Sequence, residues 1–486
     1  MKAWEFKVAN DPITGAPRKP WEHQLADFAA FKDADAFGCW SEMGTGKTST
    51  AINILEYKRS RCGLNRGLIL VPASIVDGWE EEFLGAWGIR PLNLTRMRSS
   101  AQRLRAIAAC PTGTPYLLSN YDGLMGIEDA LYDWLGKDFS MVADESTYFK
   151  NGRAQRSKAV LRLGNHASFK MAMSGTPGPQ GEEDYFSQYL YLDPRIFGTS
   201  FVGFRNYWMT MGGFMGREVM GLRPELRKEF NKRLYSVASR HVKAECMDMP
   251  PKNYVTLRYD LEPSEQRVYD QLAAEWIAEV TEGGKRVSVT DGMTRSLRMA
   301  QVCTGFIGDR QAGETEEHEI PRSGSKLAVL QELLENLDGK AIIWCKWKRN
   351  VRDVLALCKK LKIKAVSFYG ETDDKKASDF AFRNDPKTRV TVGTQKSGGA
   401  GRNLQGPEVK TVVYFSQDYS NEARMQSEDR AHRGGISHTV TIYDIVARHT
   451  IEEAIVKTLR DGRNAMDFIL QNPKEFAVGK VPGRRK

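Results

Sequence analysis

Short apolar runs alternate with longer amphipathic stretches in two parts of the chain. Each apolar run is followed by a polar or glycine-rich turn, and then by residues whose hydrophobic positions have helical spacing. Such runs are typical of strands in a parallel sheet that is covered by helices. In the first part, we expect strands at residues 37–40, 67–71, 116–118, 139–143 and 169–173. In the second part, we expect them at residues 341–345, 365–368, 389–392, 411–415 and 440–446.

The two series predict an α/β protein with two lobes of similar size. Between them, from about residue 185 to residue 321, the sequence is mostly helical and has little β character. The one acidic run of this stretch, GETEEHE at residues 313–319, is most simply a solvated loop. The segments that we expect are an N-terminal lobe at 1–235, a helical linker at 236–324, a C-terminal lobe at 325–470 and a basic tail at 471–486. A length of 486 residues agrees with this organisation.

Composition narrows the class of protein. Hydrophobic residues make up 41% and charged residues 27% of the chain, which is the profile of a globular protein and not of a disordered one. No apolar run approaches the roughly 18–20 residues that span a bilayer, and the N-terminus lacks the apolar core of a secretory signal. We therefore expect neither an integral membrane protein nor an exported one.

Cysteine usage and net charge indicate which ligands and partners to expect. The seven cysteines are scattered without a C-x-x-C pair, which favours free thiols in a reducing compartment, and we expect no zinc module. Lys and Arg total 71 and Asp and Glu total 61, so the net charge is +10. The segment from Lys474 to Lys486 holds five basic residues and one acidic residue, a net of +4. A basic balance favours a polyanionic partner, although a solvated surface explains it equally well.

The strongest local signal is SEMGTGKT at residues 41–48. It lies between a predicted strand and a helical pattern, which is the context of a phosphate-binding P-loop, although Ser41 replaces the first glycine of G-x-x-x-x-G-K-[ST]. Its glycines let backbone N–H groups curl around phosphate oxygens. Lys47 can reach the β and γ phosphates, and the hydroxyl of Thr48 can bind Mg²⁺. The predicted ATP-binding residues here are Gly44, Thr45, Gly46, Lys47 and Thr48.

A P-loop needs an acidic partner at the end of a neighbouring strand, and DFSMVADEST at residues 138–147 supplies one. Asp144 is placed to hold Mg²⁺, and Glu145 to orient and deprotonate the attacking water. In isolation, such an Asp-Glu pair is commonly a helix cap. Together with the P-loop, it indicates a catalytic pair.

A third segment, QSEDRAHRGG at residues 426–435, places Arg430 and Arg433 three residues apart on one predicted helix face. Arginines at this spacing can both reach one γ-phosphate and stabilise the charge of the transition state. Without further context, two such arginines are more often salt-bridge partners on a solvent-facing helix.

Taken in order, these segments resemble the motif series of superfamily-two helicases, and specifically the Swi/Snf-type DNA translocases, from residue 20 to residue 459. The resemblance implies two RecA-like P-loop lobes with a helical insertion between them. It makes Arg430 and Arg433 catalytic arginine fingers and implies that Gln426 contributes to ATP binding. Gln24, in PWEHQ, resembles the upstream glutamine that reads adenine.

Further segments resemble motifs that contact the nucleic acid or couple it to the ATP site. LILVPASIVDGWEEEF resembles motif Ia, MSGTP motif III, AIIWCKW motif IV and KSGGAGRNL motif V. Two longer stretches, residues 185–198 and 240–272, are closer to Swi/Snf proteins than to other helicases. The residues implied for DNA contact or coupling are Pro72, Ser74, Ser174, Thr176, Lys346, Gly399 and Asn403, and Gly401 is implied in ATP binding.

The sequence departs from the family pattern in three places. The acidic motif usually reads DEAH or DEAD, whereas here Ser146 and Thr147 follow the two carboxylates. The fourth position normally links the ATP site to motif VI, so this change bears on how hydrolysis is coupled to movement. Ser41 stands where an acidic residue often opens motif I, and Gly434-Gly435 stands where the family tends to end IGQ.

The resemblance implies an ATP hydrolase that uses ATP and Mg²⁺ and translocates along duplex or branched DNA with little sequence preference. RNA and membranes are not expected as partners. We expect a bare motor of the kind that bacteria and their phages encode, in the cytoplasm of such cells. Two alternatives remain: a strand-separating or branch-migrating helicase, and an ATP-gated DNA-binding clamp in which Thr147 has uncoupled hydrolysis from movement.

Overall fold

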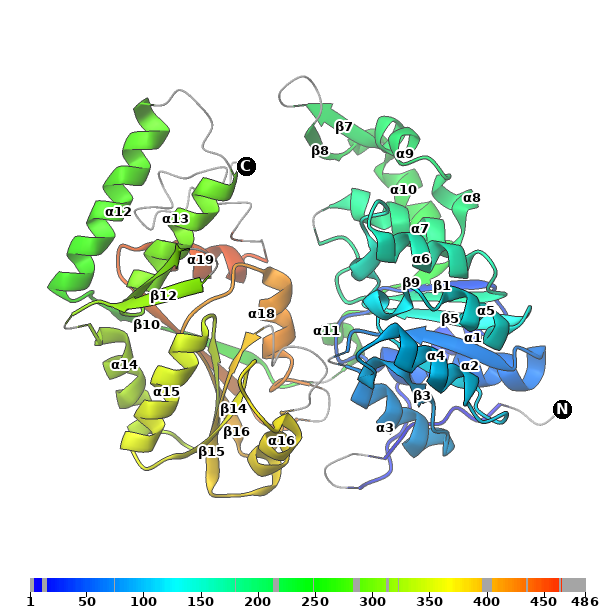
Figure 1. Cartoon of the computed structure of the whole chain (residues 1–486), viewed down its shortest axis with the longest axis horizontal. Coiled ribbons are helices and arrows are strands. Elements are labelled where there is room, and N and C mark those ends of the chain that lie inside the picture. Colours follow the sequence, from blue (N-terminus) through cyan, green and yellow to red (C-terminus); the bar gives the residue numbers. More distant parts are fainter. Residues whose placement is uncertain are drawn as a thin grey trace. The chain divides into compact units, whose positions relative to one another are not determined.

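Two separate parallel sheets organise the chain. The computed structural model describes residues 4–10, 15–73, 75–179, 181–212, 218–247, 249–282, 289–311, 314–321, 323–395, 404–433, 436–462 and 465. The chain divides into unit 1, Met1–Asp248, and unit 2, Met249–Lys486 (Figure 1). The predicted basic tail at 471–486 lies outside the described residues.

Unit 1 contains a parallel sheet of seven strands in the order β3-β4-β2-β5-β6-β1-β9. Its strands are β1 (Ala36–Cys39), β2 (Arg66–Leu70), β3 (Leu92–Asn93), β4 (Tyr116–Ser119), β5 (Phe139–Asp144), β6 (Phe169–Met173) and β9 (Ala238–Ser239). An antiparallel hairpin follows α9 in the chain and is formed by β7 (Met209–Gly212) and β8 (Glu218–Leu222) (Figure 1).

Helices cover both faces of this sheet. They are α1 (Glu22–Phe31), α2 (Lys47–Cys62), α3 (Val76–Trp87), α4 (Ser100–Ala108), α5 (Glu128–Leu135), α6 (Gln155–Gly164), α7 (Tyr185–Leu192), α8 (Pro194–Phe197), α9 (Phe201–Trp208), α10 (Arg227–Leu234) and α11 (Lys243–Cys246). Short 3-10 turns are η1 (Leu94–Arg96), η2 (Tyr121–Leu124), η3 (Ser146–Phe149), η4 (Glu182–Asp184) and η6 (Pro224–Leu226). Buried residues of α1, α2 and α3 pack in one hydrophobic cluster, and those of α4 to α7 in another.

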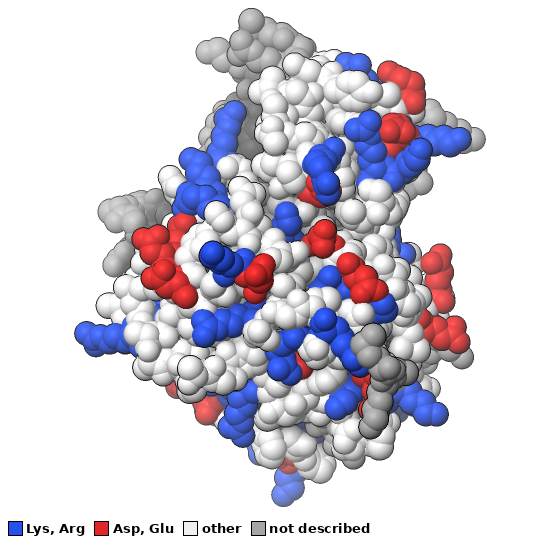
Figure 2. All heavy atoms as spheres, turned by 90° about the vertical axis from the view of Figure 1, so that its right-hand side faces the viewer, with Lys and Arg blue, Asp and Glu red and all other residues white. Residues whose placement is uncertain are grey.

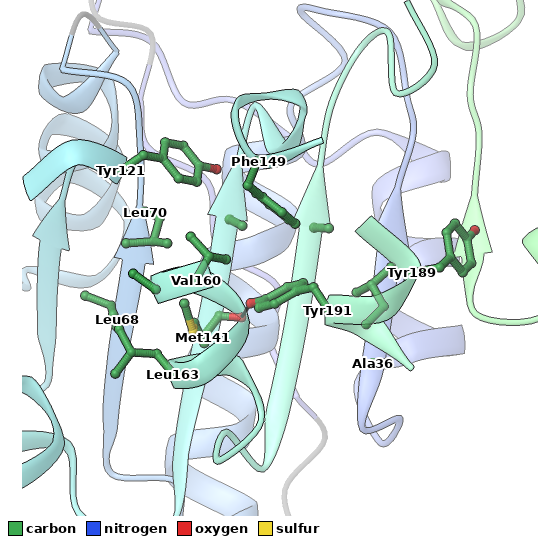
Figure 3. Packing of buried hydrophobic residues seen from close by; sticks show 14 of the residues in the cluster. Ala36, Leu68, Leu70, Tyr121, Met141, Phe149, Val160, Leu163, Tyr189 and Tyr191 are labelled. Atoms are coloured by element: carbon green, nitrogen blue, oxygen red, sulfur yellow. Dashed lines mark hydrogen bonds between the residues drawn. The ribbon is translucent and has the colours of Figure 1, made fainter. Parts of the chain in front are cut away.

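The alternation of side chains along β2 shows why the apolar runs are continuous. Leu68 and Leu70 belong to the cluster on one face, and Ile69 between them belongs to the cluster on the other face. Successive strand residues point to opposite faces, so a strand that is covered on both sides must be apolar at every position. Figure 3 shows Leu68 and Leu70 beside Val160 and Leu163, which α6 contributes to the same cluster.

Unit 2 contains a parallel sheet of six strands in the order β10-β17-β16-β13-β15-β14. Its strands are β10 (Lys252–Tyr259), β13 (Lys340–Cys345), β14 (Lys364–Phe368), β15 (Thr388–Thr394), β16 (Val409–Tyr414) and β17 (Val440–Ala447), and a separate hairpin is formed by β11 (Phe306–Gln311) and β12 (Glu314–Glu319). The helices are α12 (Pro263–Glu282), α13 (Val289–Val302), α14 (Ser325–Glu335), α15 (Lys348–Lys360), α16 (Lys375–Asn384), α18 (Asn421–Glu428) and α19 (Ile451–Arg460).

The structure confirms the predicted α/β class, with two parallel sheets flanked by helices as in RecA-like lobes. Each predicted strand is present, with ends that differ from the prediction by at most two residues. The sequence analysis missed three of the four strands at the sheet edges, β3, β9 and β10, and predicted the fourth, β14. Edge strands are short or partly exposed, so they lack the continuous apolar run that marks a central strand.

The prediction of a solvated loop at the acidic run is wrong. Residues Glu314–Glu319 form β12, which pairs antiparallel with β11. Two arginines of α15 compensate its charge: Arg349 lies 3.3 Å from Glu319, and Arg352 lies 3.1 Å from Glu317. The stretch of predicted low β character therefore contains two hairpins and the edge strand β10.

The stretch at 236–324, predicted as a helical linker, is divided between the two units. The strand β9 pairs with β1 in the sheet of unit 1, whereas β10 pairs with β17 in the sheet of unit 2. Because both pairings join residues far apart in the sequence, local patterns do not reveal them. The boundary between the units falls after Asp248.

Charge is distributed and not gathered on the face of the molecule that Figure 2 presents. There, lysine and arginine side chains are interspersed with aspartate and glutamate (Figure 2). Among the described residues, no helix combines the length and the apolar character that a bilayer crossing requires.

Candidate functional site

Three loops meet at one edge of the unit 1 sheet. The strands β1, β6 and β5 are neighbours in that order, and Met173 at the end of β6 is in register with both Cys39 and Asp144. The segments that follow these strands are the P-loop, the SGTP segment (residues 174–177) and the acidic motif (residues 144–147). The carboxyl edge of a parallel sheet is where ligands bind in folds of this class.

The P-loop has the backbone that its glycines predict. Gly44 and Gly46 adopt φ values of 79° and 75°, in the left-handed region that glycine enters without a steric penalty. A Cβ atom on Gly46 would lie 2.3 Å from Nε2 of Gln24 and 2.9 Å from the ring of Trp21. The helix α2 begins at Lys47, so its first N–H groups open onto the loop.

Lys47 and Thr48 occupy the first turn of α2. The ammonium group of Lys47 donates to the carbonyl oxygens of Ser41, at 2.8 Å, and Glu42, at 3.0 Å. The hydroxyl of Thr45 donates to the same Glu42 carbonyl, at 2.7 Å, which closes the loop upon itself. The loop is therefore held in a cradle shape by its own side chains.

Two side chains of helix α1 donate hydrogen bonds to the backbone of the P-loop. Gln24 is 2% exposed, and its Nε2 donates to the carbonyl of Gly46, at 3.0 Å, while its Oε1 accepts the backbone N–H of Trp21. The neighbouring His23 donates from Nε2 to the carbonyl of Thr45, at 2.8 Å. Burial lowers the pKa of His23. The structure thus brings Gln24 to the P-loop, and its predicted role in reading adenine stays a prediction.

A segment from the end of unit 1 also contacts the P-loop. The backbone N–H of His241 donates to the hydroxyl of Ser41, at 3.2 Å, and the N–H of Glu42 donates to the carbonyl of His241, at 2.9 Å. The ring of His241 also contacts the carboxylate of Asp27, at 2.9 Å. Sequence reasoning missed His23 and His241. His23 adjoins Gln24, but His241 lies 200 residues from Ser41 and gives no local signal.

Asp144 is buried at the end of β5 and is held by several donors. Trp79 Nε1 donates to its Oδ2, at 2.8 Å, and the backbone N–H of Glu145 donates to its Oδ1, at 2.9 Å. Burial raises the pKa of Asp144, while the Trp79 hydrogen bond and the Lys47 charge lower it. Lys47, which is predicted to reach the phosphates, therefore interacts electrostatically with Asp144, which is predicted to hold Mg²⁺.

Glu145 has an unusual backbone conformation, with φ 52° and ψ 56°. A non-glycine residue in the left-handed region costs on the order of 1–2 kcal/mol, and such strain clusters at functional sites. The residues around it are fixed: Tyr121 donates its hydroxyl to the carbonyl of Asp144, at 2.6 Å, and Tyr148 N–H donates to the carbonyl of Glu145, at 3.0 Å. Only 8% of Glu145 is exposed. The backbone of Glu145 is therefore fixed from both sides by its neighbours.

The SGTP segment lies between the P-loop and the acidic motif. Ser174 is buried, its N–H donates to the carbonyl of Cys39, at 3.2 Å, and its hydroxyl accepts from the N–H of Thr176. A Cβ atom on Gly175 would lie 2.8 Å from Cγ of Met43, so the segment packs directly against the P-loop. The coupling role that the resemblance implies for Ser174 and Thr176 stays a prediction.

The residues predicted from motif Ia are only partly described. Pro72 is buried just after β2, and its carbonyl accepts the N–H of Ile75. Ser74 lies outside the described residues. The Pro72 side chain thus belongs to the interior of unit 1.

In unit 2, the prediction of a helix face carrying Arg430 and Arg433 is wrong. The helix α18 ends at Glu428, and both arginines lie in the turns that follow it. The N–H of Arg430 bonds to the carbonyl of Ser427, a tighter turn than that of an α-helix, and two glycines follow Arg433. Arg430 is buried and Arg433 is half-buried. Gln426 remains on α18, where its amide donates to Glu422.

The helix α18 is anchored by a buried charge network. Arg424 donates to Glu428, at 2.7 Å, and to Asp444, at 2.5 Å, and Lys252 of β10 donates to Glu428, at 2.8 Å. Burial alone would raise the pKa of Glu428, but the charges of Lys252 and Arg424 lower it to about 2. This network fixes the residues that immediately precede Arg430. Arg424 and Glu428 have helical i,i+4 spacing, but Asp444 lies 20 residues from Arg424 and Lys252 lies 176 residues from Glu428, so local spacing does not indicate the network as a whole.

Lys346 lies at the end of β13, at the carboxyl edge of the unit 2 sheet. Its backbone N–H donates to the hydroxyl of Ser416, at 2.8 Å, and its ammonium lies 3.2 Å from the centre of the Tyr419 ring. The predicted residues Gly399, Gly401 and Asn403 lie outside the described residues.

Comparison with known proteins agrees with this arrangement. The SNF2-related domain matches residues 39–305, more than half of the chain, and the helicase conserved C-terminal domain matches residues 325–435. The chain belongs to the SNF2 family. The two domain matches place this SNF2 protein among the ATP-hydrolysing enzymes of helicase superfamily two. Its two parallel sheets agree with that assignment.

Its relatives include cellular and phage proteins. The uncharacterized ATP-dependent helicase MG018 of Mycoplasma genitalium is 25% identical over 90% of this chain and 40% of its own length, and the mouse DNA annealing helicase and endonuclease ZRANB3 is 25% identical over 89% and 39%. The chain thus spans about 40% of these relatives. A putative protein p41 of Acyrthosiphon pisum secondary endosymbiont phage 1 is 23% identical over 95% of this chain and 99% of its own length.

A solved structure is also similar over most of the chain. The SWI2/SNF2 ATPase core of Sulfolobus solfataricus in complex with dsDNA covers 96% of this chain and 98% of its own, at 18% identity and a TM-score of 0.42. The family assignment rests on the domain matches and not on this alignment.

Proposed function

We propose that this SNF2 protein is a DNA-stimulated ATPase motor that translocates along double-stranded or branched DNA. The observation that carries the proposal is the carboxyl edge of the unit 1 sheet. There a P-loop lysine follows β1, and a buried aspartate and a glutamate at positive φ lie at the end of β5, with only β6 between the two strands. Family membership supports ATP as the nucleotide and DNA as the track.

The geometry suggests a division of labour in this site. The P-loop N–H groups and the start of α2 bind the phosphates, and Lys47 exchanges its two loop carbonyls for phosphate oxygens. Glu145, whose backbone has positive φ at the end of β5, orients the attacking water and accepts its proton. From the motif resemblance, and not from the geometry, we further propose that Arg430 and Arg433 stabilise the charge that develops on the γ-phosphate.

The residues present fit a magnesium ion. The carboxylate of Asp144 and the hydroxyl of Thr48 are oxygen donors of the kind that Mg²⁺ prefers, and Asp144 is buried with its charge favoured by the Trp79 donor. When bound, Mg²⁺ would neutralise charge on the β and γ phosphates.

DNA binding is proposed to be largely independent of sequence. Contacts to phosphates set such affinity, so it should fall steeply with salt and depend little on base order. We assign these contacts to the segments that carry the residues predicted from motifs Ia, IV and V, with the exception of Pro72, whose side chain is buried in unit 1.

The test is a comparison of ATP hydrolysis rates with single-stranded, duplex, forked and four-way DNA and with RNA. We expect stimulation by DNA, and the Lys47→Ala variant should lose turnover while it retains DNA binding. Lys58→Ala is a matched control, because Lys58 is a buried lysine of the same helix that donates to the carbonyl of Ala34, at 2.7 Å, away from the loop. If no DNA changes the wild-type rate, the motor proposal is wrong.

Two assays distinguish the alternatives. Displacement of a triplex-forming strand indicates translocation on duplex DNA, whereas release of a labelled strand from a fork indicates strand separation. DNA-stimulated hydrolysis with neither outcome would favour the ATP-gated clamp.

A further inference from the structure

The acidic motif of this chain contains a serine whose hydroxyl is hydrogen-bonded to helix α7. Ser146, directly after Glu145, is completely buried, and its hydroxyl donates to Oε1 of Gln188, at 2.5 Å. The motif in related proteins usually reads DEAH or DEAD, so a serine at this position gives the chain a hydrogen-bonding group that alanine lacks.

Gln188 is itself completely buried on α7, and its amide group bonds to backbone carbonyls. Its Nε2 donates to the carbonyl of Pro177, at 2.6 Å, and to the carbonyl of Asp184, at 2.9 Å. Carbonyl oxygens only accept, so the NH₂ side of the amide must face them. Its oxygen must therefore face Ser146, whose hydroxyl can only be the donor. The hydrogen-bonding chemistry permits one arrangement of this pair.

The amide of Gln188 joins the acidic motif to the SGTP segment. The SGTP segment in turn contacts the P-loop. Pro177 ends the SGTP segment, and Gly175 of that segment packs against Met43 of the P-loop. A change in the P-loop can therefore pass through the SGTP backbone to Gln188 and from there to Ser146. All of these contacts lie within unit 1.

The strained backbone of Glu145 is the element that this connection can act upon. A residue at φ 52° keeps that conformation only where its neighbours hold it. On one side, Trp79 and Tyr121 bond to Asp144. On the other side, the bond from Ser146 to Gln188 holds the chain. Loss of that bond weakens the hold on this side, where the N–H of Tyr148 also donates to the carbonyl of Glu145, at 3.0 Å.

We propose that Gln188 is a positioning residue, which holds Glu145 in its strained conformation and links the acidic motif to the SGTP segment. The proposal rests on ATP hydrolysis at this site, as set out under the proposed function. It also gives Ser146 a role, because its hydroxyl supplies the hydrogen bond that joins the acidic motif to Gln188.

The experiment measures turnover and nucleotide affinity of full-length variants. In Gln188→Leu, we expect DNA-stimulated kcat to fall about 10-fold or more, while the affinity for a non-hydrolysable ATP analogue changes by less than about 3-fold. Ser146→Ala should lower kcat in the same direction. The double variant should be no worse than Gln188→Leu alone, because both changes break one connection.

Tyr191→Phe is the control for a structural effect. Tyr191 lies on the same helix, is buried, and donates its hydroxyl to the carbonyl of Met141, at 2.8 Å, in the core (Figure 3). Removal of this hydroxyl should lower the free energy of unfolding and leave kcat unchanged. Equal losses of kcat in Tyr191→Phe and Gln188→Leu, or additive losses in the double variant, would overturn the proposal. Ser146→Ala keeps the test valid if Gln188→Leu does not fold.

Amide hydrogen exchange provides a readout that needs no turnover. Exchange at residues 144–148 should become faster in Gln188→Leu and Ser146→Ala and stay unchanged in Tyr191→Phe. Unchanged exchange there would contradict the positioning role. If the wild-type protein fails to hydrolyse ATP, the proposed function is wrong, and exchange alone still decides whether Gln188 holds the acidic motif.

Discussion

A comparison of the two glycines that flank α2 tests whether the stability of the P-loop depends on its contact with α1. Gly46 precedes this helix and Gly63 follows it, and both have φ 75°. A Cβ atom on Gly63 meets nothing within 4 Å, whereas one on Gly46 collides with Gln24 and Trp21. Gly63→Ala therefore measures the backbone penalty alone, and Gly46→Ala adds the collision.

The magnitude follows from the bonds that Gln24 must give up. Alanine in the left-handed region costs about 1–2 kcal/mol, which both variants share. To avoid a Cβ at 2.3 Å, Gln24 has to move, and it then loses its bonds to the carbonyl of Gly46 and the N–H of Trp21. Two such bonds contribute about 1–3 kcal/mol. We expect Gly46→Ala to lose about this much more free energy of unfolding than Gly63→Ala.

Urea denaturation of both variants measures the difference, and binding of a fluorescent ATP analogue measures its effect on the site. Gly63→Ala should bind the analogue as the wild type does. Gly46→Ala should bind it at least about 10-fold more weakly, which corresponds to about 1.4 kcal/mol. Equal stability and equal affinity of the two variants would refute the reasoning, because Gln24 would then not support the loop.

Further predictions concern both units. In Trp79→Phe, Asp144 loses a donor to its charged form, so its pKa rises further and the acid limb of ATPase activity moves to higher pH, with roughly 10-fold lower activity at neutral pH. A pH–rate profile checks this. Glu428→Gln should cost on the order of 3 kcal/mol at neutral pH, because the wild-type carboxylate has a pKa of about 2 against 4.5. That stability is present above about pH 4.5 and is lost as the pH falls towards 2, so the difference between the two proteins in urea denaturation shrinks on acidification. An Arg433→Ala variant should lower kcat by about 10³-fold or more without weakening binding of the ATP analogue, as single-turnover kinetics can measure.

The central strands could be predicted because burial on both faces demands apolar residues at every position. In β5, each residue from Phe139 to Asp144 is buried, and the run stands out in the sequence. The edge strand β10 has a mixture of exposed and half-buried residues, and only its pairing with β17 makes it a strand. The same holds for β12, whose acidic sequence indicates a loop until Arg349 and Arg352 are seen beside it.

The chemistry of the site was predictable where it depends on residues that are adjacent in the sequence. The P-loop requires glycines, a lysine and a hydroxyl at fixed spacing, and the acidic motif requires two successive carboxylates. The residues that hold these groups in place were not predictable, because Trp79 lies 65 residues from Asp144 and Gln188 lies 42 residues from Ser146. The helix end before Arg430 likewise depends on Lys252, which lies 176 residues from Glu428.

By itself, the sequence determined the α/β class, the order of the central strands along the chain and the places of the P-loop and the acidic motif at the ends of β1 and β5. Each of these follows from local spacing, which hydrophobic burial and phosphate chemistry impose on neighbouring residues. Only the tertiary structure decided which buried donors fix Asp144, why Glu145 keeps a strained backbone and how Gln188 joins two loops. Those properties arise from contacts between distant segments, and a buried polar group finds its partner wherever the fold brings one within hydrogen-bonding distance.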